Sequence, residues 1–160
     1  MLQIIIAHPG KQHSFHTAIG VKKTGFRMQY CTTVYDKPGS LTHFIKRFLS
    51  KNDSEKANTR RNSEIKDSEV CQILEWYGLY QLFMMRRNIS GDQYNKINDS
   101  LNVRFGHRVA KLAKKMHADA VISYDNNSMT LFSDLKRTSP ETIRILDVSA
   151  ANRLYMKEIY

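Results

Sequence analysis

Short apolar runs alternate with helical patterns along this chain, and this alternation limits its possible folds more than any other feature. Four runs rich in apolar and β-branched residues predict strands, at 2–7, 28–35, 118–124 and 142–148. The first run is apolar throughout except for Gln3, as in a strand that is buried on both faces of a parallel sheet. Strands that alternate with helices in this way predict a mainly parallel sheet with right-handed crossovers.

Helical patterns fill the stretches between these runs. Residues 14–23 carry apolar side chains at helical spacing, and Thr24 with Gly25 supplies a stop signal. The region 64–117 contains two helical patterns, separated by the Asn-, Ser- and Gly-containing break at 88–92. Helices between parallel strands must cover both faces of the sheet. The fold class that we predict is therefore α/β, a Rossmann-like three-layer domain with a mainly parallel sheet.

Residues 41–51 form a basic amphipathic pattern that can be interpreted in two ways. Ser40 provides a helix start, and one apolar stripe follows it: Leu41, Phe44, Ile45, Phe48 and Leu49. The basic residues Lys46, Arg47 and Lys51 lie on or beside the opposite face. Such a helix either packs its stripe into the core or lies flat on an anionic membrane, and the need to cover the sheet favours the core. The next stretch, 52–63, lacks apolar periodicity and is expected to be a mobile excursion.

Length and composition indicate one cytoplasmic domain over residues 1–160. A chain of 160 residues and 18.6 kDa is long enough for a single core but not for two ordinary domains. No apolar run is long enough to span a bilayer, and residues 1–7 do not have the pattern of a secretory signal. Cys31 and Cys71 stand singly among apolar neighbours, so we expect buried thiols rather than a disulfide or a zinc site.

The net charge of +10 favours anionic partners, such as nucleic acid, phosphorylated substrates or an acidic membrane face. Part of this charge lies in the helical stretch 104–115, which contains no acid. Its basic residues are Arg104, Arg108, Lys111, Lys114 and Lys115. They fall mostly opposite a partial apolar face, so a solvated helix surface is the expected structure.

Polar turns follow three of the predicted strands, at the edge where open α/β sheets bind their ligands. The first turn combines one glycine, two histidines and a lysine: His8, Pro9, Gly10, Lys11, Gln12, His13 and Ser14. Gly10 permits close approach of a ligand, Ser14 can cap the next helix, and free amides at a helix start attract anions. Alternatively, Pro9 and Gly10 form only a tight turn, with the histidines in capping or packing roles. The turn has neither the dinucleotide-binding GxGxxG motif nor a P-loop.

The other two turns offer fewer polar groups. Asp125, in the turn 124–128, either caps the following helix or hydrogen-bonds a sugar hydroxyl. Asp147 and Ser149 follow the last strand, where capping is again the alternative. We expect residues 8–14, 125–128 and 147–149 to form one pocket together.

Four segments resemble the amino-terminal half of a group 1 (family 4) glycosyltransferase of GT-B architecture. They are HPGKQHSFHTAIGVKKTG, QYCTTVYDKPGSL, ADAVISYDNNS and RILDVSAAN, and the resemblance covers essentially the whole chain. It implies an acceptor-side domain, one of two Rossmann-like domains that face a cleft. The other domain binds the nucleotide-sugar and carries a pair of glutamates without a counterpart here. The resemblance thus implies that the carboxy-terminal donor-binding domain is absent from this chain.

The resemblance also implies roles for individual residues. Gly10, with Pro9 and Lys11, would lie against the donor diphosphate, and residues 12–14 would lie near the acceptor or the transferred sugar. The family often has a histidine where this chain has Tyr124, so Asp125 and Asn126 would have to serve in its place. The candidate substrate-binding residues are therefore His8, Gly10, Lys11, Gln12, His13, Ser14, Tyr124, Asp125, Asn126 and Asp147. No catalytic residue is assigned.

The activity that the resemblance implies is transfer of a hexose, with retention, from a nucleotide-sugar to a glycan or lipid-linked acceptor. No Asp-x-Asp motif is present, so no metal is implied, and no cofactor is expected. Most of the cationic clamp for the leaving diphosphate would lie in the second domain, so we expect the chain alone to be inactive. Its partners would be the donor and the acceptor. Its location would be cytoplasmic, with peripheral contact to the anionic inner face of a membrane.

A non-catalytic nucleic-acid-binding α/β module is the alternative function. The net charge of +10 and the 8 Tyr and 7 Phe residues favour it. The aromatic residues lie mostly at core spacing, however, and no RNA- or DNA-binding motif is present, so we expect no nucleic-acid partner. A receiver-type signalling domain would need acidic residues after the first strand, where Ala7 and His8 stand.

Overall fold

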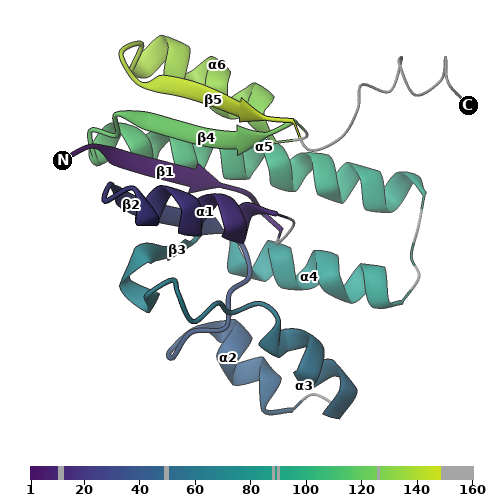
Figure 1. The fold of residues 1–160 in the computed structure, drawn as a ribbon. Helices are drawn as coiled ribbons and strands as arrows, with labels where there is room; N and C mark the ends of the chain where they lie inside the picture. The colour runs from purple at the N-terminus through teal and green to yellow at the C-terminus, as the bar shows by residue number, and fades with distance from the viewer. Residues whose placement is uncertain (11–12, 49–50, 88, 90, 126, 149–160) are drawn as a thin grey trace, which may run out of the picture.

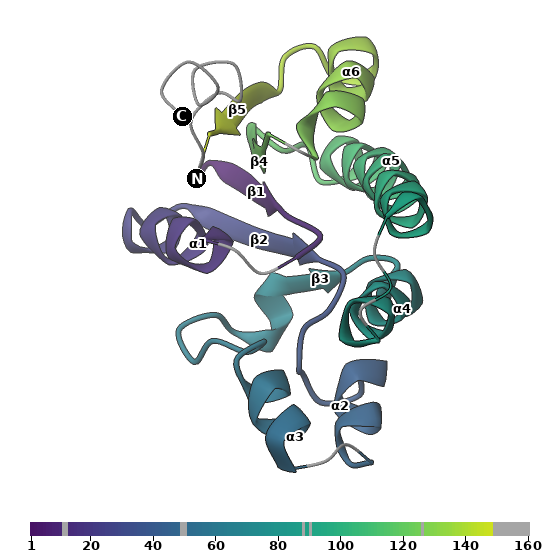
Figure 2. The same cartoon turned by 90° about the vertical axis from the view of Figure 1, so that its right-hand side faces the viewer.

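The chain folds around a five-stranded parallel sheet with the strand order β3-β2-β1-β4-β5 (Figures 1 and 2). The computed structural model describes residues 1–10, 13–48, 51–87, 89, 91–125 and 127–148. The strands are β1 (Gln3–Ala7), β2 (Arg27–Thr32), β3 (Val70–Gln72), β4 (Ala120–Tyr124) and β5 (Ile143–Asp147). Each neighbouring pair is parallel, so all five carboxyl ends lie at one edge. The predicted α/β class and three-layer arrangement are confirmed.

Helices cover both faces of this sheet. They are α1 (Ser14–Lys23), α2 (Leu41–Lys46), α3 (Lys51–Asn58), α4 (Glu75–Arg86), α5 (Asp92–Lys115) and α6 (Ser128–Thr138), with a 3-10 turn, η1, at Asp67–Glu69. Helix α1 lies on one face, whereas α4, α5 and α6 lie on the other (Figure 2). Helices α2 and α3 extend beyond the β3 edge of the sheet (Figures 1 and 2).

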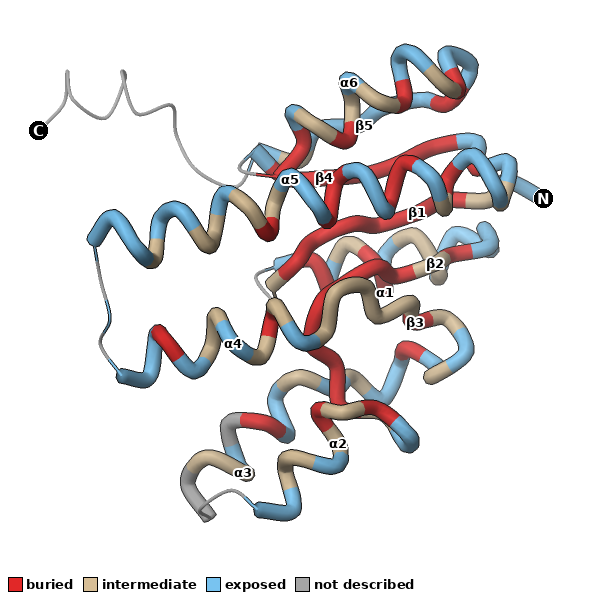
Figure 3. Tube along the Cα trace, turned by 180° about the vertical axis from the view of Figure 1, so that it is seen from behind, coloured by how far each residue is buried: buried red, intermediate tan, exposed pale blue. Residues whose placement is uncertain are grey.

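Two apolar cores lie on the two faces of β1. Ile4 and Ile6 pack in the core beneath α1, and Ile5 packs in the core beneath α5 and α6. This alternation matches the period of two in a strand, and it explains why the run is apolar on both faces. The basic face of α5 is exposed, as predicted, and its buried residues form a stripe toward the sheet (Figure 3).

Four of the five strands correspond to predicted runs, with β2 beginning one residue before its run, at Arg27, but β3 was not predicted. Its three residues are too few to show a period of two, and they lie in a stretch that was interpreted as helical. Strand β2 is also shorter than the run 28–35. Its ladder stops at Thr32, because the chain then turns and the amide of Thr33 donates to the carbonyl of Pro9 at 3.3 Å.

Two predictions for the region 41–63 are wrong. The stretch expected to be an irregular excursion begins within α3, whose residue Ala57 is buried. The apolar stripe of 41–49 does not enter the core, because Phe44 is 57% and Phe48 is 75% exposed. The reason is that α2 packs on α3 and α4 beyond the sheet, not on the sheet itself (Figure 1). Leu49 lies outside the described residues.

The start signal of α2 and the stop signal of α1 lie where the sequence predicts them. Ser40 is the N-cap of α2, and its hydroxyl accepts from the amide of His43 at 3.0 Å. Helix α1 ends at Lys23, and Gly25 follows with a φ of 82°. Such a positive φ favours glycine.

The two cysteine thiols are free and face each other across β2 and β3, where Cys31 and Cys71 are in register. Cys31 is buried as expected, but Cys71 is only half-buried. A hydrogen bond with Cys71, together with burial, raises the pKa of the Cys31 thiol well above its usual value. The same hydrogen bond, aided by nearby Lys37, lowers the pKa of Cys71 to about 7.

Gly78 lets α4 pack closely on the chain that leaves β2. A Cβ at this position would lie 2.6 Å from Cβ of Thr33 and 2.7 Å from Cγ2 of Val34. These separations are well inside van der Waals contact, so any side chain here would push α4 away from the sheet edge. Gly20, in α1, has nothing within 4 Å of the same position.

We predict opposite effects of alanine at these two helical glycines. Gly78→Ala should lower the free energy of unfolding by about 2 kcal/mol, because it overpacks a tight contact. Gly20→Ala should raise it by about 0.5–1 kcal/mol, because it removes backbone entropy from the unfolded chain without a clash. Urea unfolding followed by circular dichroism measures both values. A Gly78→Ala protein that is as stable as Gly20→Ala would contradict the packing of α4 described here.

Candidate functional site

A pocket of about 290 Å³ lies at the carboxyl edge of the sheet, between the strand ends and the helices α4 and α5. We call it the polar pocket. Its residues come from the turns after β1, β2 and β4, from the two helices and from the chain just after α3: His8, Pro9, Gly10, Thr33, Val34, Arg60, Gly78, Gln81, Leu82, Met85, Tyr94, Asn98, Asn102 and Asn127. This is the edge at which open parallel sheets bind ligands.

Amide and hydroxyl groups line the helical wall of the polar pocket. Tyr94, Asn98 and Asn102 recur every four residues on α5, so they share one face of that helix. Gln81 of α4 donates to the side-chain oxygen of Asn98 at 2.7 Å. These residues were not predicted from the sequence, although a polar stripe with helical spacing is visible in it.

The turn after β1 is held in one conformation by its own hydrogen bonds. The amide of Gly10 donates to Nδ1 of His8 at 2.9 Å, so that ring nitrogen is unprotonated. The hydroxyl of Thr33 donates to the carbonyl of Pro9 at 2.6 Å. The ring of His8 also meets the ring of Tyr124 edge-on, with centroids 4.9 Å apart. His8 and Gly10 are therefore fixed parts of the pocket wall.

The other candidate residues from the sequence are distributed more widely. His13 is exposed at the N-cap position of α1, and it makes no side-chain capping bond there. Ser14, expected as a cap, is instead the first residue of α1; it is buried, and its hydroxyl hydrogen-bonds that of Tyr30 at 2.8 Å. Asp125 is exposed, and the N-cap of α6 is Asn127. Lys11, Gln12, Asn126 and Ser149 lie outside the described residues.

Tyr124 and Asp147 meet at α1, on the opposite face of the sheet from the helical wall of the polar pocket. The hydroxyl of Tyr124 donates to Oγ1 of Thr17 at 2.9 Å, and Thr17 donates to Asp147 at 3.3 Å. Burial raises the pKa of Tyr124. The three turns thus share the carboxyl edge of the sheet, but their side chains form two groups. His8, Gly10 and Asn127 line the polar pocket, whereas Tyr124 and Asp147 contact Thr17.

Arg60, just after α3, also lines the polar pocket. It is half-buried, and its guanidinium makes no hydrogen bond or ion pair with any residue that the structure describes. Burial lowers the pKa of Arg60, and the nearby positive charge of Arg86 lowers it further. A half-buried cation without a partner favours an anionic ligand.

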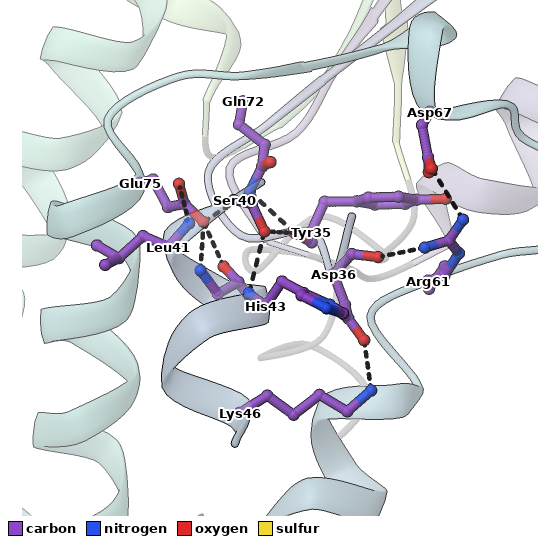
Figure 4. Close-up of polar contacts among 11 residues, drawn as sticks. Tyr35, Asp36, Ser40, Leu41, His43, Lys46, Arg61, Asp67, Gln72 and Glu75 are labelled. Carbon is purple, nitrogen blue, oxygen red and sulfur yellow. Dashed lines mark hydrogen bonds and ion pairs between the residues drawn. The ribbon is translucent and has the colours of Figure 1, made fainter. Parts of the chain in front are cut away.

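The position of Arg60 depends on a group of polar contacts around Asp36, which we call the Asp36 cluster (Figure 4). The Asp36 carboxylate is 5% exposed and accepts from Lys46 at 2.6 Å and from His43 at 2.7 Å. Burial acts to raise the pKa of Asp36, but these two hydrogen bonds outweigh it and hold the pKa below its usual value. Lys46, which was expected on or beside the face opposite the apolar stripe, is thus paired with a buried carboxylate.

Backbone contacts extend the Asp36 cluster to the chain after α3. The amide of Asp36 donates to the carbonyl of Arg60 at 3.3 Å. The guanidinium of Arg61 donates to the carbonyl of Asp36 at 3.2 Å and pairs with Asp67 at 2.9 Å (Figure 4). These contacts attach the end of α3 to the chain that leaves β2, and so they fix where Arg60 stands.

Glu75 attaches the start of α2 to the start of α4 (Figure 4). Its Oε1 accepts from the amide of Thr42 at 2.7 Å and from Gln72 at 2.9 Å. The free amides at the start of α2 are therefore satisfied by a carboxylate from another helix.

Within the described part of the chain, no group of three or more His, Cys, Asp or Glu side chains is arranged to hold a metal ion. None of the described helices combines the length and hydropathy needed to cross a membrane. Comparisons with protein-family models and with curated proteins gave no match to this chain. Its function must therefore be argued from the geometry of the site.

We predict that Asp36→Asn lowers the free energy of unfolding by about 2 kcal/mol at pH 7, because Lys46 and His43 lose a charged acceptor. The pKa of Asp36 is lowered on folding, so its contribution is present above the ordinary aspartate pKa of about 3.9 and is lost as the pH falls. The difference in the free energy of unfolding between Asp36→Asn and the unmodified protein should therefore disappear as the pH falls below about 4. Urea unfolding between pH 3 and pH 7 measures it.

Glu141→Gln is the matched control, because Glu141 is exposed and forms no ion pair with the described residues. It should change the free energy of unfolding by less than about 0.5 kcal/mol at every pH. An Asp36→Asn protein that matches this control at pH 7 would show that the Asp36 cluster does not hold the fold.

Proposed function

We propose that this chain is the acceptor-side half of a glycosyltransferase, which holds a glycan or lipid-linked acceptor for sugar transfer from a nucleotide-sugar. The observation that carries the proposal is the polar pocket at the carboxyl edge of the sheet, with amide and hydroxyl groups on one side and the β1 turn on the other. The resemblance of four segments to the amino-terminal half of family 4 glycosyltransferases supports the same activity.

The chemistry of the pocket wall suits sugar hydroxyls. Each sugar hydroxyl is both a donor and an acceptor, and a carboxamide offers both kinds of group side by side. Gln81, Asn98, Asn102 and Asn127 supply four carboxamides around one space. Met85 and Leu82 supply apolar surface in the same pocket, against which the C–H face of a sugar ring can pack.

The pocket residues are suited to binding rather than to acid–base chemistry. None of the lining residues that the structure describes is a carboxylate. The unprotonated nitrogen of His8 accepts from Gly10, so it is not free to take a proton from a substrate. In the transfer, the bond from the anomeric carbon to the diphosphate oxygen breaks with its electron pair on the diphosphate. The acceptor hydroxyl oxygen forms the new bond to that carbon, and its proton passes to an oxygen of the leaving diphosphate. Stabilising that leaving group requires cations and amides beyond those of this pocket, which a facing domain would supply.

We predict that the chain binds saccharides in the polar pocket and that a carboxamide on α5 contributes to that binding. Asn102→Ala should weaken saccharide binding about five- to tenfold, as expected for the loss of one hydrogen bond. Asn95→Ala is the control, because Asn95 lies on the same helix but is exposed and outside the pocket. Saturation-transfer NMR with a panel of mono- and disaccharides measures binding. If no saccharide binds at millimolar concentration, or if both variants lose binding equally, the proposal fails.

A second prediction concerns turnover. The 160-residue chain should neither transfer sugar nor hydrolyse a nucleotide-sugar at a measurable rate, because differential stabilisation of the leaving diphosphate needs a facing domain. Release of nucleoside diphosphate from a panel of nucleotide-sugars measures it. Saturable turnover by the pure chain would overturn the half-enzyme proposal.

Tight binding of short DNA or RNA with a steep salt dependence, in place of saccharide binding, would favour the nucleic-acid module instead.

A further inference from the structure

A second pocket, of about 340 Å³, lies between α2, α3 and α4, beside the polar pocket. We call it the apolar pocket. Its wall is mainly aliphatic and aromatic, with Ile45 from α2, Ala57 from α3, and Leu79, Leu82 and Phe83 from α4. The volume is near the lower end of the range for small-molecule sites, about 300–1,000 Å³. A pocket of this volume suits one alkyl chain of a ligand rather than two.

Aromatic side chains on α4 border this pocket and are left facing solvent. Trp76, Tyr80 and Phe83 recur at helical spacing along α4, and Trp76 is 70% exposed. Phe44 on the neighbouring helix α2 is exposed as well. Contiguous apolar surface of this kind marks a site for an apolar ligand or partner.

Two arginines give the apolar pocket a charge preference. Arg60 and Arg86 both line it, and their mutual repulsion contributes to the lowered pKa of Arg60. Arg86 is paired with Asp53 at 3.5 Å, whereas the guanidinium of Arg60 makes no hydrogen bond or ion pair with the described residues. An anionic group at Arg60 would supply the missing counter-charge.

The two pockets share part of their lining. Val34, Arg60 and Leu82 line both the polar and the apolar pocket. A single ligand can therefore place hydroxyl groups against the amides of α5, an anionic group at Arg60 and an apolar chain between α3 and α4.

We propose that the apolar pocket binds a single alkyl or isoprenoid chain whose anionic head group, a phosphate or a carboxylate, contacts Arg60. This inference rests on the proposed function and names the acceptor class: a sugar-accepting amphiphile with one apolar chain and a negative charge. Recognition of the chain comes from the apolar wall, and recognition of the head group comes from Arg60. The same chemistry occurs in a monomeric amphiphile and in a membrane lipid.

The experiment follows the fluorescence of Trp76, the only tryptophan of the chain, which borders the apolar pocket. The probe is monododecyl phosphate below its micelle concentration, with inorganic phosphate and the uncharged dodecyl maltoside for comparison. We expect saturable binding of dodecyl phosphate with a blue shift of the emission. Shorter alkyl phosphates should bind about fourfold more weakly for each methylene removed. Inorganic phosphate should cause no shift.

Variants of Arg60 and Arg27 separate the head-group contact from general charge, and a fourth variant fills the pocket. Arg60→Gln should weaken dodecyl phosphate binding at least about tenfold and leave dodecyl maltoside binding unchanged, and Arg60→Lys should restore part of the loss. Arg27→Gln, which removes an exposed arginine at the start of β2, should bind like the unmodified protein. Ala57→Leu fills the pocket from α3 and should weaken both amphiphiles, with circular dichroism as the check on folding.

Several outcomes would overturn the inference. They are non-saturable binding, an affinity that does not depend on chain length, and an equal loss for Arg60→Gln and Arg27→Gln. Vesicles provide the other source of the same chemistry. Binding to vesicles with phosphatidic acid, but not to monomeric dodecyl phosphate, would assign this surface to a membrane interface and not to a ligand pocket. If dodecyl phosphate does not bind while saccharides do, this inference fails and the proposed function is retained. If dodecyl phosphate binds while saccharides do not, the proposed function fails.

Discussion

The buried carboxylate of Asp36 determines how the region beyond the sheet edge is arranged. Its side chain holds α2 through Lys46 and His43, and its backbone contacts the chain at Arg60 and Arg61. Helices α2 and α3 have few buried apolar residues of their own, so packing alone would not fix them. A charged acceptor with two donors, in a nearly dry position, supplies directional contacts in its place. The apolar pocket and the position of Arg60 both follow from this arrangement.

Two pockets with different linings lie side by side at the carboxyl edge of the sheet. The polar pocket is lined by amides and the rigid β1 turn, and the apolar pocket is lined by α3 and α4. Arg60 lies where the two pockets meet, and its guanidinium makes no hydrogen bond or ion pair with the described residues. The described lining of the two pockets combines carboxamides, a guanidinium and apolar side chains. These groups support the proposal of a binding half whose chemistry would depend on a facing domain.

Local and periodic features of the fold could be predicted from the sequence. The apolar run of β1, the Ser40 cap and the break between α4 and α5 depend on neighbouring residues, so they are visible in a single chain. Strand β3 has only three residues, and it exists because its backbone pairs with β2, a contact of long sequence range. Helix α3 lacks apolar periodicity, so its position could not be predicted from such a pattern. Polar contacts between the chain after β2 and the residues that follow α3 hold it in place instead.

Only the part of the candidate site that is formed by a local pattern could be predicted from the sequence. The turn after β1 could be located, because a strand followed by a glycine-containing turn is a local pattern. The amides of α5 and Arg60 were missed. Nothing in the sequence shows that residues 60, 81 and 98 converge; only the packing of α3, α4 and α5 around the sheet edge brings them together. Tyr124 and Asp147 were expected in the pocket, but they point toward α1, because side chains alternate between the two faces of a strand.

The proposed ligand would place one alkyl chain between α3 and α4 and its charged end at Arg60. Intermolecular NOEs between monododecyl phosphate and the methyl groups of the labelled protein would locate this chain. We expect NOEs from the end of the alkyl chain to Ile45, Leu79 and Leu82, which line the apolar pocket. NOEs to Ile143 and Leu146 instead, which are exposed on the edge strand β5, would show that the alkyl chain binds elsewhere and would rule out the proposed site.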